Sequence, residues 1–98
     1  MLKGPLSRSR FFNVYAVANR LQYARLGMAV SRKVSLRAVE RNRIKRLIRD
    51  FFRHHQKGLV GRDIVVVVKA AAANQAHTEL RDSLSKDLGR AAELCSIY

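Results

Sequence analysis

The segment RNRIKRLIR, at positions 41–49, decides the architecture of this chain because it combines a narrow apolar stripe with a dense row of cations. An α-helix turns by about 100° per residue, which places the apolar residues of this segment on one face. We expect an amphipathic helix from about Leu36 to His54, with Ser35 as its N-cap. The stripe that would pack on a core consists of Ile44, Leu47, Ile48 and Phe51.

The cations of this helix repeat every four residues along one flank of the stripe. Like charges at this spacing destabilise an isolated helix by roughly 0.2–0.5 kcal/mol per pair, and the nearby acids are Glu40 and Asp50. A solvated basic face is the ordinary explanation of a charge run, but a polyanionic ligand better explains three successive pairs. The row is Arg41, Lys45, Arg49 and Arg53, with Asn42 and Arg46 further round the helix.

The charge of the whole chain is strongly and unevenly basic. Its 98 residues carry 20 Lys and Arg against seven Asp and Glu, a formal net charge of +13. Residues 1–53 hold 14 of these cations and two acids, which is +12, whereas residues 54–98 hold six and five, which is +1. A basic field concentrated in one half of a small domain is typical of nucleic-acid-binding proteins.

Membrane association is the competing explanation of such charge. No apolar run approaches the roughly 20 residues that span a bilayer, and the N-terminus shows no secretory signal pattern. Cys95 is the one cysteine, which excludes an internal disulfide and suits a reducing compartment. We therefore expect a cytoplasmic protein without a membrane partner.

Two segments before the helix alternate with period two and predict strands. Arg10–Ala18 turns an apolar face toward the core and carries Phe11, Asn13 and Tyr15 on its other face. Arg25–Lys33 has small residues on that second side, which leaves a shallow trough beside the aromatics. Such a surface suits stacking on unpaired bases, although another helix could equally cover it. The small residues are Gly27, Ala29 and Ser31, and Arg32 and Lys33 would lie at the end of the trough.

The rest of the chain completes an α+β sandwich of two layers in the order β-β-α-β-α. Asp63–Lys69 is β-branched and apolar, which predicts a buried central strand. A last helix is expected over about Ala76–Ala92, with leucines at intervals of four residues. The predicted organisation is a poorly ordered lead-in at 1–9, one domain at 10–92 and a tail at 93–98.

No constellation of residues predicts an active site or a metal site. His54 and His55 are adjacent, so their side chains diverge on a helix, and His77 lies far along the chain. Cys95 has no basic neighbour in sequence that would activate its thiol. The chain does not look like a catalyst acting alone.

The segment at 41–49, preceded by Ala38-Val39 and by GMAVSRK at 27–33, strongly resembles the protein subunit of bacterial ribonuclease P. The match to that family's signature helix is nearly unbroken, and the expected elements follow the family's order over about Arg10–Ala92. The resemblance implies the ribonuclease P protein-like fold, shared with a domain of a small-subunit ribosomal protein. It also implies a left-handed crossover between parallel strands, where pattern reasoning alone would choose a right-handed one.

The resemblance implies a role in tRNA maturation as the non-catalytic subunit of an endoribonuclease. In that enzyme a large RNA performs the hydrolysis with Mg²⁺, and the protein contacts this RNA and the 5′ leader of precursor tRNA. Carried over by position, the RNA-binding motif is Arg41, Asn42, Arg43, Lys45, Arg46 and Arg49, to which the charge pattern adds Arg53, Arg32 and Lys33. The cleft for the single-stranded leader would be lined by Phe11, Asn13, Tyr15, Ser31 and Lys69.

One departure from the family pattern concerns the N-terminus. Family members usually carry a basic, aromatic-bearing helix before the first strand, and we expect Met1–Ser9 to be too short to supply it. A sheet face left uncovered in this way would favour self-association. The alternatives to the subunit role are a ribosomal-protein-like module that holds RNA without aiding cleavage, and a basic amphipathic protein directed at anionic membranes or acidic proteins.

Overall fold

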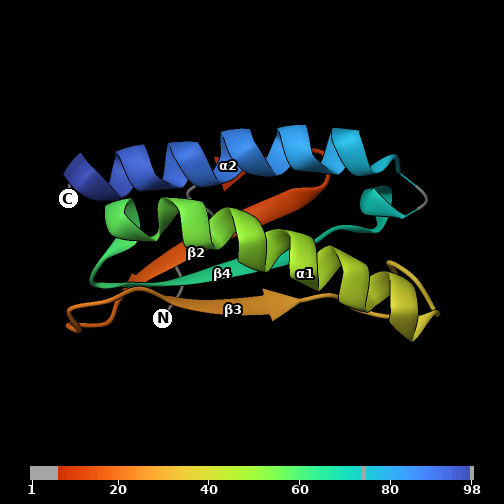
Figure 1. Cartoon of the computed structure of the whole chain (residues 1–98), viewed down its shortest axis with the longest axis horizontal. Coiled ribbons are helices and arrows are strands. Elements are labelled where there is room, and N and C mark those ends of the chain that lie inside the picture. Colours follow the sequence, from red (N-terminus) through yellow and green to blue (C-terminus); the bar gives the residue numbers. More distant parts are fainter. Residues whose placement is uncertain (1–6, 74, 98) are drawn as a thin grey trace.

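The computed structural model describes residues 7–73 and 75–97, with side chains as far as Glu93. Two helices lie together on one face of a four-stranded sheet (Figure 1). The predicted two-layer α+β sandwich is therefore confirmed, with one strand more than expected. The elements are β1 (Ser7–Arg8), β2 (Phe12–Ala18), β3 (Arg25–Ala29), α1 (Ala38–His55), β4 (Arg62–Val68) and α2 (His77–Ile97), with short 3-10 turns at Gln56–Leu59 and Ala70–Ala72.

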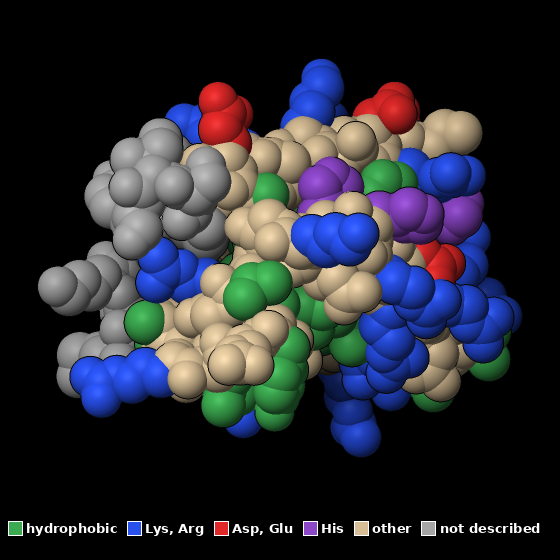
Figure 2. Space-filling view, turned by 60° about the vertical axis from the view of Figure 1, so that its left-hand side comes forward, with side chains coloured by type: hydrophobic (Ala, Val, Ile, Leu, Met, Phe, Trp, Pro, Cys, Tyr) green, Lys and Arg blue, Asp and Glu red, His purple; other side chains and the backbone are tan. Residues whose placement is uncertain are grey.

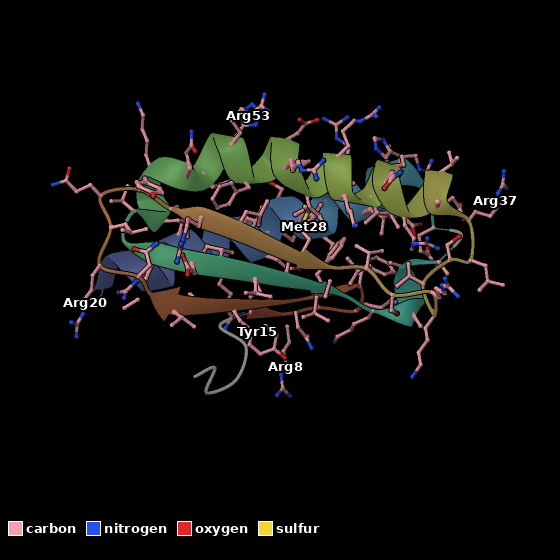
Figure 3. The ribbon with its side chains drawn as sticks, turned by 90° about the horizontal axis from the view of Figure 1, so that it is seen from below. Arg8, Tyr15, Arg20, Met28, Arg37 and Arg53 are labelled. Carbon is pink, nitrogen blue, oxygen red and sulfur yellow. The ribbon has the colours of Figure 1, made fainter. Side chains whose placement is uncertain are left out.

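The sheet has the strand order β1-β2-β4-β3, so β4 is central as predicted. Strand β2 runs antiparallel to β1 and β4, whereas β3 and β4 are parallel. Figure 3 looks onto the sheet from the side opposite the helices, and Figures 1 and 3 together show that the path from β3 through α1 to β4 is left-handed. This agrees with the family resemblance and departs from the general right-handed preference.

The core lies between the sheet and the helices. Alternation places Phe12 and Val14 of β2 beside Ile64 and Val66 of β4, and all four are 0% exposed. Burying a side chain of this size stabilises the fold by about 1.5–3 kcal/mol. The helices contribute a matching set to this core, namely Ile44, Leu47, Ile48 and Phe52 from α1 and Leu80, Leu84, Leu88 and Ala91 from α2.

The apolar stripe of α1 differs from its prediction at one position. Phe52 is buried, whereas Phe51 is half-buried and packs at the margin of the core. Phe52 follows Ile48 by four residues and lies on the same side of the helix, so the buried face of α1 extends past the predicted stripe on that side. Strand β4 also differs, because Val65 and Val67 are half-buried on the face that carries no helix. It is central in the sheet, and the described residues cover only one of its sides.

The start of α1 was predicted incorrectly. The helix begins at Ala38 with Arg37 as its N-cap, and no side chain caps it. Ser35 lies before it and folds the chain into a turn, since its hydroxyl donates to Glu40 Oε2 at 2.8 Å and accepts from the Arg37 N–H at 3.1 Å. The serine is therefore a bracing residue for the turn that leads into α1.

The N-terminal segment contains structure where a lead-in was predicted. Ser7–Arg8 forms β1 and pairs with Asn13 and Val14 of β2. The strand is held because Ser7 and Ser9 donate hydrogen bonds to the buried carboxylate of Asp87, at 3.0 and 2.7 Å. This partner lies almost 80 residues away, which is why local patterns did not indicate it. The rest of the predicted lead-in, residues 1–6, lies outside the described residues.

Two other boundaries differ from the predictions. Strand β3 ends at Ala29 rather than at residue 33, because Ser31 starts a turn in which its backbone oxygen accepts from the Val34 N–H at 3.0 Å. Helix α2 continues to Ile97, so most of the predicted tail at 93–98 is helical and Tyr98 lies outside the described residues. The helix thus ends five residues later than its leucine pattern suggested.

Candidate nucleic-acid interface

The outer flank of α1 presents most of the cations that the sequence singled out. Figure 2 shows Lys and Arg side chains gathered along one side of the molecule. Arg41 and Lys45 are half-buried because their stems lie nearest the apolar stripe. The residues of the motif that are exposed are Asn42, Arg43, Arg46, Arg49 and Arg53.

These cations have no carboxylate partner in the part of the chain that the structure describes. Glu40, the acid in the first turn of α1, is already engaged by Ser35. Arg41 donates through Nη1 to the backbone oxygen of Ser35 at 2.8 Å, which orients it without neutralising its charge. The flank is therefore a field of uncompensated positive charge on a rigid helix, suited to paired hydrogen bonds with phosphates.

The turn between β3 and α1 extends this basic surface. Arg32 and Lys33 are exposed there, directly before the helix. Two large apolar side chains beside them, Leu36 and Val39, are 82% and 75% exposed. Exposed apolar groups among cations suit contact with sugars or base faces. We did not predict this feature. Leu36 and Val39 lie outside the apolar stripe of α1, and this position could have predicted that they are exposed.

The face of the sheet opposite the helices is open among the described residues (Figure 3). Register places Tyr15, Val65 and Gly27 in one row across β2, β4 and β3. The missing side chain of Gly27 contributes to a shallow hollow of about 260 Å³ that reaches Arg25 and Asp63. Strand β4 lies between β2 and β3, so the small residues of β3 do not border Phe11 and Tyr15 directly as predicted. Among the described residues no helix covers this face, and its hollow lies at the end near Arg25 and Asp63.

Two of the predicted cleft residues have other roles in this structure. Phe11 is 7% exposed and packs against Phe12, with the guanidinium carbon of Arg10 5.4 Å from the centre of its ring. Lys69 is half-buried, and its Nζ donates to the backbone oxygen of Ser9 at 2.7 Å. Both therefore brace the segment between β1 and β2, and Phe11 is not an accessible stacking surface.

The remaining predicted cleft residues are at the surface of this face or at its end. Tyr15 is half-buried on β2, and Ser31 is exposed in the turn after β3. Asn13 is half-buried, and its Oδ1 is buried without a hydrogen-bond partner among the described residues. An unsatisfied buried acceptor is costly. Because this oxygen is buried, it does not face an incoming ligand in this conformation. Arg8, on β1, also reaches this side and was not predicted (Figure 3).

A hydrogen-bonded ion pair closes one end of the open face. Arg25 contacts Asp63 through two hydrogen bonds of 2.7 Å, and Asn19 donates to the same carboxylate at 2.9 Å. These hydrogen bonds hold the pKa of Asp63 below its ordinary value, and the hydrogen bond from Arg25 has the largest effect. Asn19 also accepts from the Leu21 N–H at 2.8 Å, so the network fixes the loop between β2 and β3.

Neither a metal site nor a membrane span is found in the described part of the chain. No three His, Cys, Asp or Glu side chains there are grouped so that they could hold a metal ion. No helix in residues 7–73 and 75–97 is long and apolar enough to cross a bilayer. The chemistry that this geometry offers is recognition of phosphates by α1 and of bases or sugars by the sheet.

Comparison with known proteins gives a consistent family assignment. The profile of the Ribonuclease P family matches residues 2–92. A ribonuclease P protein component from Xanthomonas oryzae is 53% identical over 70 residues, which cover 71% of this chain and 48% of the relative. The component from Nitrosococcus oceani is 43% identical over 88 residues, covering 90% of this chain and 74% of the relative. The chain thus spans about half the length of the Xanthomonas relatives.

Solved structures agree with this assignment. The ribonuclease P protein of Staphylococcus aureus superimposes with a TM-score of 0.78 at 35% identity, covering 87% of this chain and 78% of that protein. The protein of Thermotoga maritima gives a TM-score of 0.74 at 32% identity, covering 91% and 83% respectively. The similarity therefore extends over most of the fold.

Proposed function

The chain belongs to the family of bacterial ribonuclease P protein components, and on this premise we propose that it is the protein subunit of a ribonuclease P that matures the 5′ ends of tRNAs. Helix α1 binds the catalytic RNA, and the open face of the sheet receives the 5′ leader of precursor tRNA. The observation that supports this most directly is the exposed flank of α1, whose cations lack acidic partners among the described residues.

Binding of the catalytic RNA is assigned to α1 and the turn before it. Arginine forks form paired hydrogen bonds with phosphates, and each neutralised phosphate releases counterions. Since the helix packs on the core through Ile44, Leu47 and Ile48, its opposite flank is presented as a rigid unit. Exposed Asn42 lies within the arginine row and can hydrogen-bond to a ribose or a base edge.

Binding of the leader is assigned to the open face of the sheet. Tyr15 offers a ring on which a base can stack, worth about 1–3 kcal/mol per base. Asn13 lies two residues from Tyr15 on the same face, and exposed Arg8 offers a cation for the backbone of the bound strand. Gly27 keeps the trough open, because any larger side chain would stand next to Val65. A single strand is favoured since its bases are free to stack.

Hydrolysis itself is assigned to the RNA, whose bound Mg²⁺ would supply the chemistry. The described residues of this chain offer no cluster of carboxylates or imidazoles that could hold that metal. The contribution of the protein is to orient the RNA and its substrate by the contacts described above. It also lowers the repulsion between two polyanions, because its cations lie between them.

Cleavage of precursor tRNA by a bacterial ribonuclease P RNA at low Mg²⁺, with and without this protein, tests the proposal. We expect the protein to stimulate cleavage at the correct 5′ position. Salt-sensitive RNA binding without stimulation would instead favour the alternative of a ribosomal-protein-like module. Absence of both effects would refute the proposed function. Binding to anionic liposomes measured in parallel decides whether the basic flank acts on membranes.

A further inference from the structure

A groove between α1 and α2 has no role in the interface described so far. Its main hollow has a volume of about 440 Å³. The hollow continues into a second one of about 390 Å³, which shares Leu47, Asp50 and His77 with it. We call this the interhelical groove, and the residues of its lining that concern ligand binding are Arg43, Arg46, Asp50, Phe51, His54 and Arg81.

An aromatic ring and a guanidinium lie together in the interhelical groove. Phe51 of α1 is half-buried, and the guanidinium carbon of Arg81 of α2 lies 5.9 Å from the centre of its ring. Arg81 is exposed, so it offers the groove a planar group supported from beneath by Phe51. RNA-binding proteins stack unpaired bases on aromatic rings and on arginine planes.

A histidine in the same groove offers a hydrogen-bond acceptor. His54 is exposed, and its Nδ1 lies 2.7 Å from the backbone oxygen of Asp50. A carbonyl oxygen accepts only, so Nδ1 carries the proton and Nε2 of the neutral ring is left as an acceptor. An acceptor fixed beside a stacking group suits the 2′-hydroxyl of RNA, which can donate to it.

The charges of the interhelical groove indicate which ligand it fits. Arg43 and Arg46 belong to the motif on α1 and also line the groove, so the groove continues the proposed interface with the catalytic RNA. Together with Arg81, the lining therefore contains three arginines and one carboxylate, that of Asp50. A phosphate at the arginine end is favoured, whereas an acidic peptide lying along the whole groove would meet the carboxylate of Asp50, which lines both hollows.

We infer that the interhelical groove holds an unpaired nucleotide of the catalytic RNA, with its base on Arg81 over Phe51 and its phosphate at Arg43 and Arg46. This inference rests on the proposed function. It assigns α2 a direct part in binding the RNA, whereas the family resemblance placed RNA contacts on α1 and the sheet. The nucleotide would fasten α2 and α1 to the same RNA segment.

Arg81→Gln tests the inference, with Lys86→Gln as its matched control. Lys86 is exposed on the same helix, five residues on and about 140° round the axis, outside the groove. Affinity for ribonuclease P RNA is measured over a series of salt concentrations. We expect Arg81→Gln to raise Kd about five- to thirty-fold and Lys86→Gln to change it less than about two-fold. Arg81→Lys keeps the charge but loses the planar group. This variant should retain the salt dependence of the wild type and lose most of the affinity that Arg81 contributes.

Footprinting of the RNA gives the second readout. Wild-type protein should protect an unpaired nucleotide that Arg81→Gln exposes and Lys86→Gln does not. An abasic substitution at that nucleotide should weaken binding of the wild-type protein. It should not weaken binding of Arg81→Gln further, because both changes remove the same contact between the base and Arg81. Equal behaviour of the two glutamine variants, or a footprint confined to paired nucleotides, would overturn the inference while leaving the subunit role intact. Failure of the wild type to bind the RNA would refute the proposed function itself.

Discussion

Replacing Asp87 by alanine tests the buried network that ties the N-terminal strand to the C-terminal helix. The residue is 5% exposed, and its carboxylate accepts from Ser7 at 3.0 Å and from Ser9 at 2.7 Å. A hydrogen bond to a charged group contributes about 1.5–3 kcal/mol. Alanine would also leave the hydroxyl of Ser7, a residue 3% exposed, without its acceptor. Alanine also removes the cost of burying a carboxylate, which offsets part of this loss. We therefore expect the free energy of unfolding to fall by about 2–4 kcal/mol.

Urea unfolding followed by circular dichroism measures this loss, and the m-value should stay unchanged if both proteins unfold in two states. Asp82→Ala is the control, because Asp82 is an exposed acid on the same helix and should change stability by at most about 0.5 kcal/mol. A cycle that combines Asp87→Ala with Ser7→Ala should show that the two losses do not add. A loss below about 1 kcal/mol, or one equal to that of the control, would show that the network is not stabilising.

Four further predictions concern the interface and the loops. Arg46→Ala should weaken binding to ribonuclease P RNA and reduce its salt slope by about one unit; an unchanged slope would remove Arg46 from the contacts. Tyr15→Ala should cost about 1–3 kcal/mol of affinity for precursor tRNA and less for mature tRNA, and equal losses would contradict a leader site on the sheet. The pKa of Asp63 is lowered mainly by its hydrogen bond with Arg25, so the stability it adds is present above the ordinary carboxyl range and lost as pH falls through the lowered value. As pH falls through this range, the urea midpoint of Asp63→Asn should therefore fall less than that of the wild type. Parallel plots of urea midpoint against pH would show that Asp63 does not stabilise the fold in this way. Gly61 has φ = +81°, so Gly61→Ala should destabilise the fold by about 1 kcal/mol; unchanged thermal unfolding would contradict this.

The sequence was most informative where periodicity and burial coincide. The alternation of Phe12 and Val14 and the apolar run at 64–68 each predicted a strand correctly, and the spacing of Ile44, Leu47 and Ile48 predicted the buried side of α1. That β2 neighbours β4 and not β3 was not predicted. These patterns arise because a strand or helix can bury only one face on a single core.

Candidate contacts were predicted less well where their role depends on distant neighbours. Phe11 alternates like a surface residue yet is buried, because the chain before β2 turns back and Arg10 covers its ring. Lys69 looks like a free cation in sequence but is bonded to Ser9, 60 residues earlier. Nothing in a local window reports such partners.

Charge, the amphipathic helix and the signature at 41–49 are properties of the sequence by itself, and they sufficed to indicate an RNA-binding protein of this family. Tertiary structure alone decided that β1 is the edge strand of the sheet, that Asp87 anchors it, and that Arg81 meets Phe51 across two helices. The physical reason is that periodicity reports which face of an element avoids water. Which elements meet, and with which polar partners, depends on how the layers pack together.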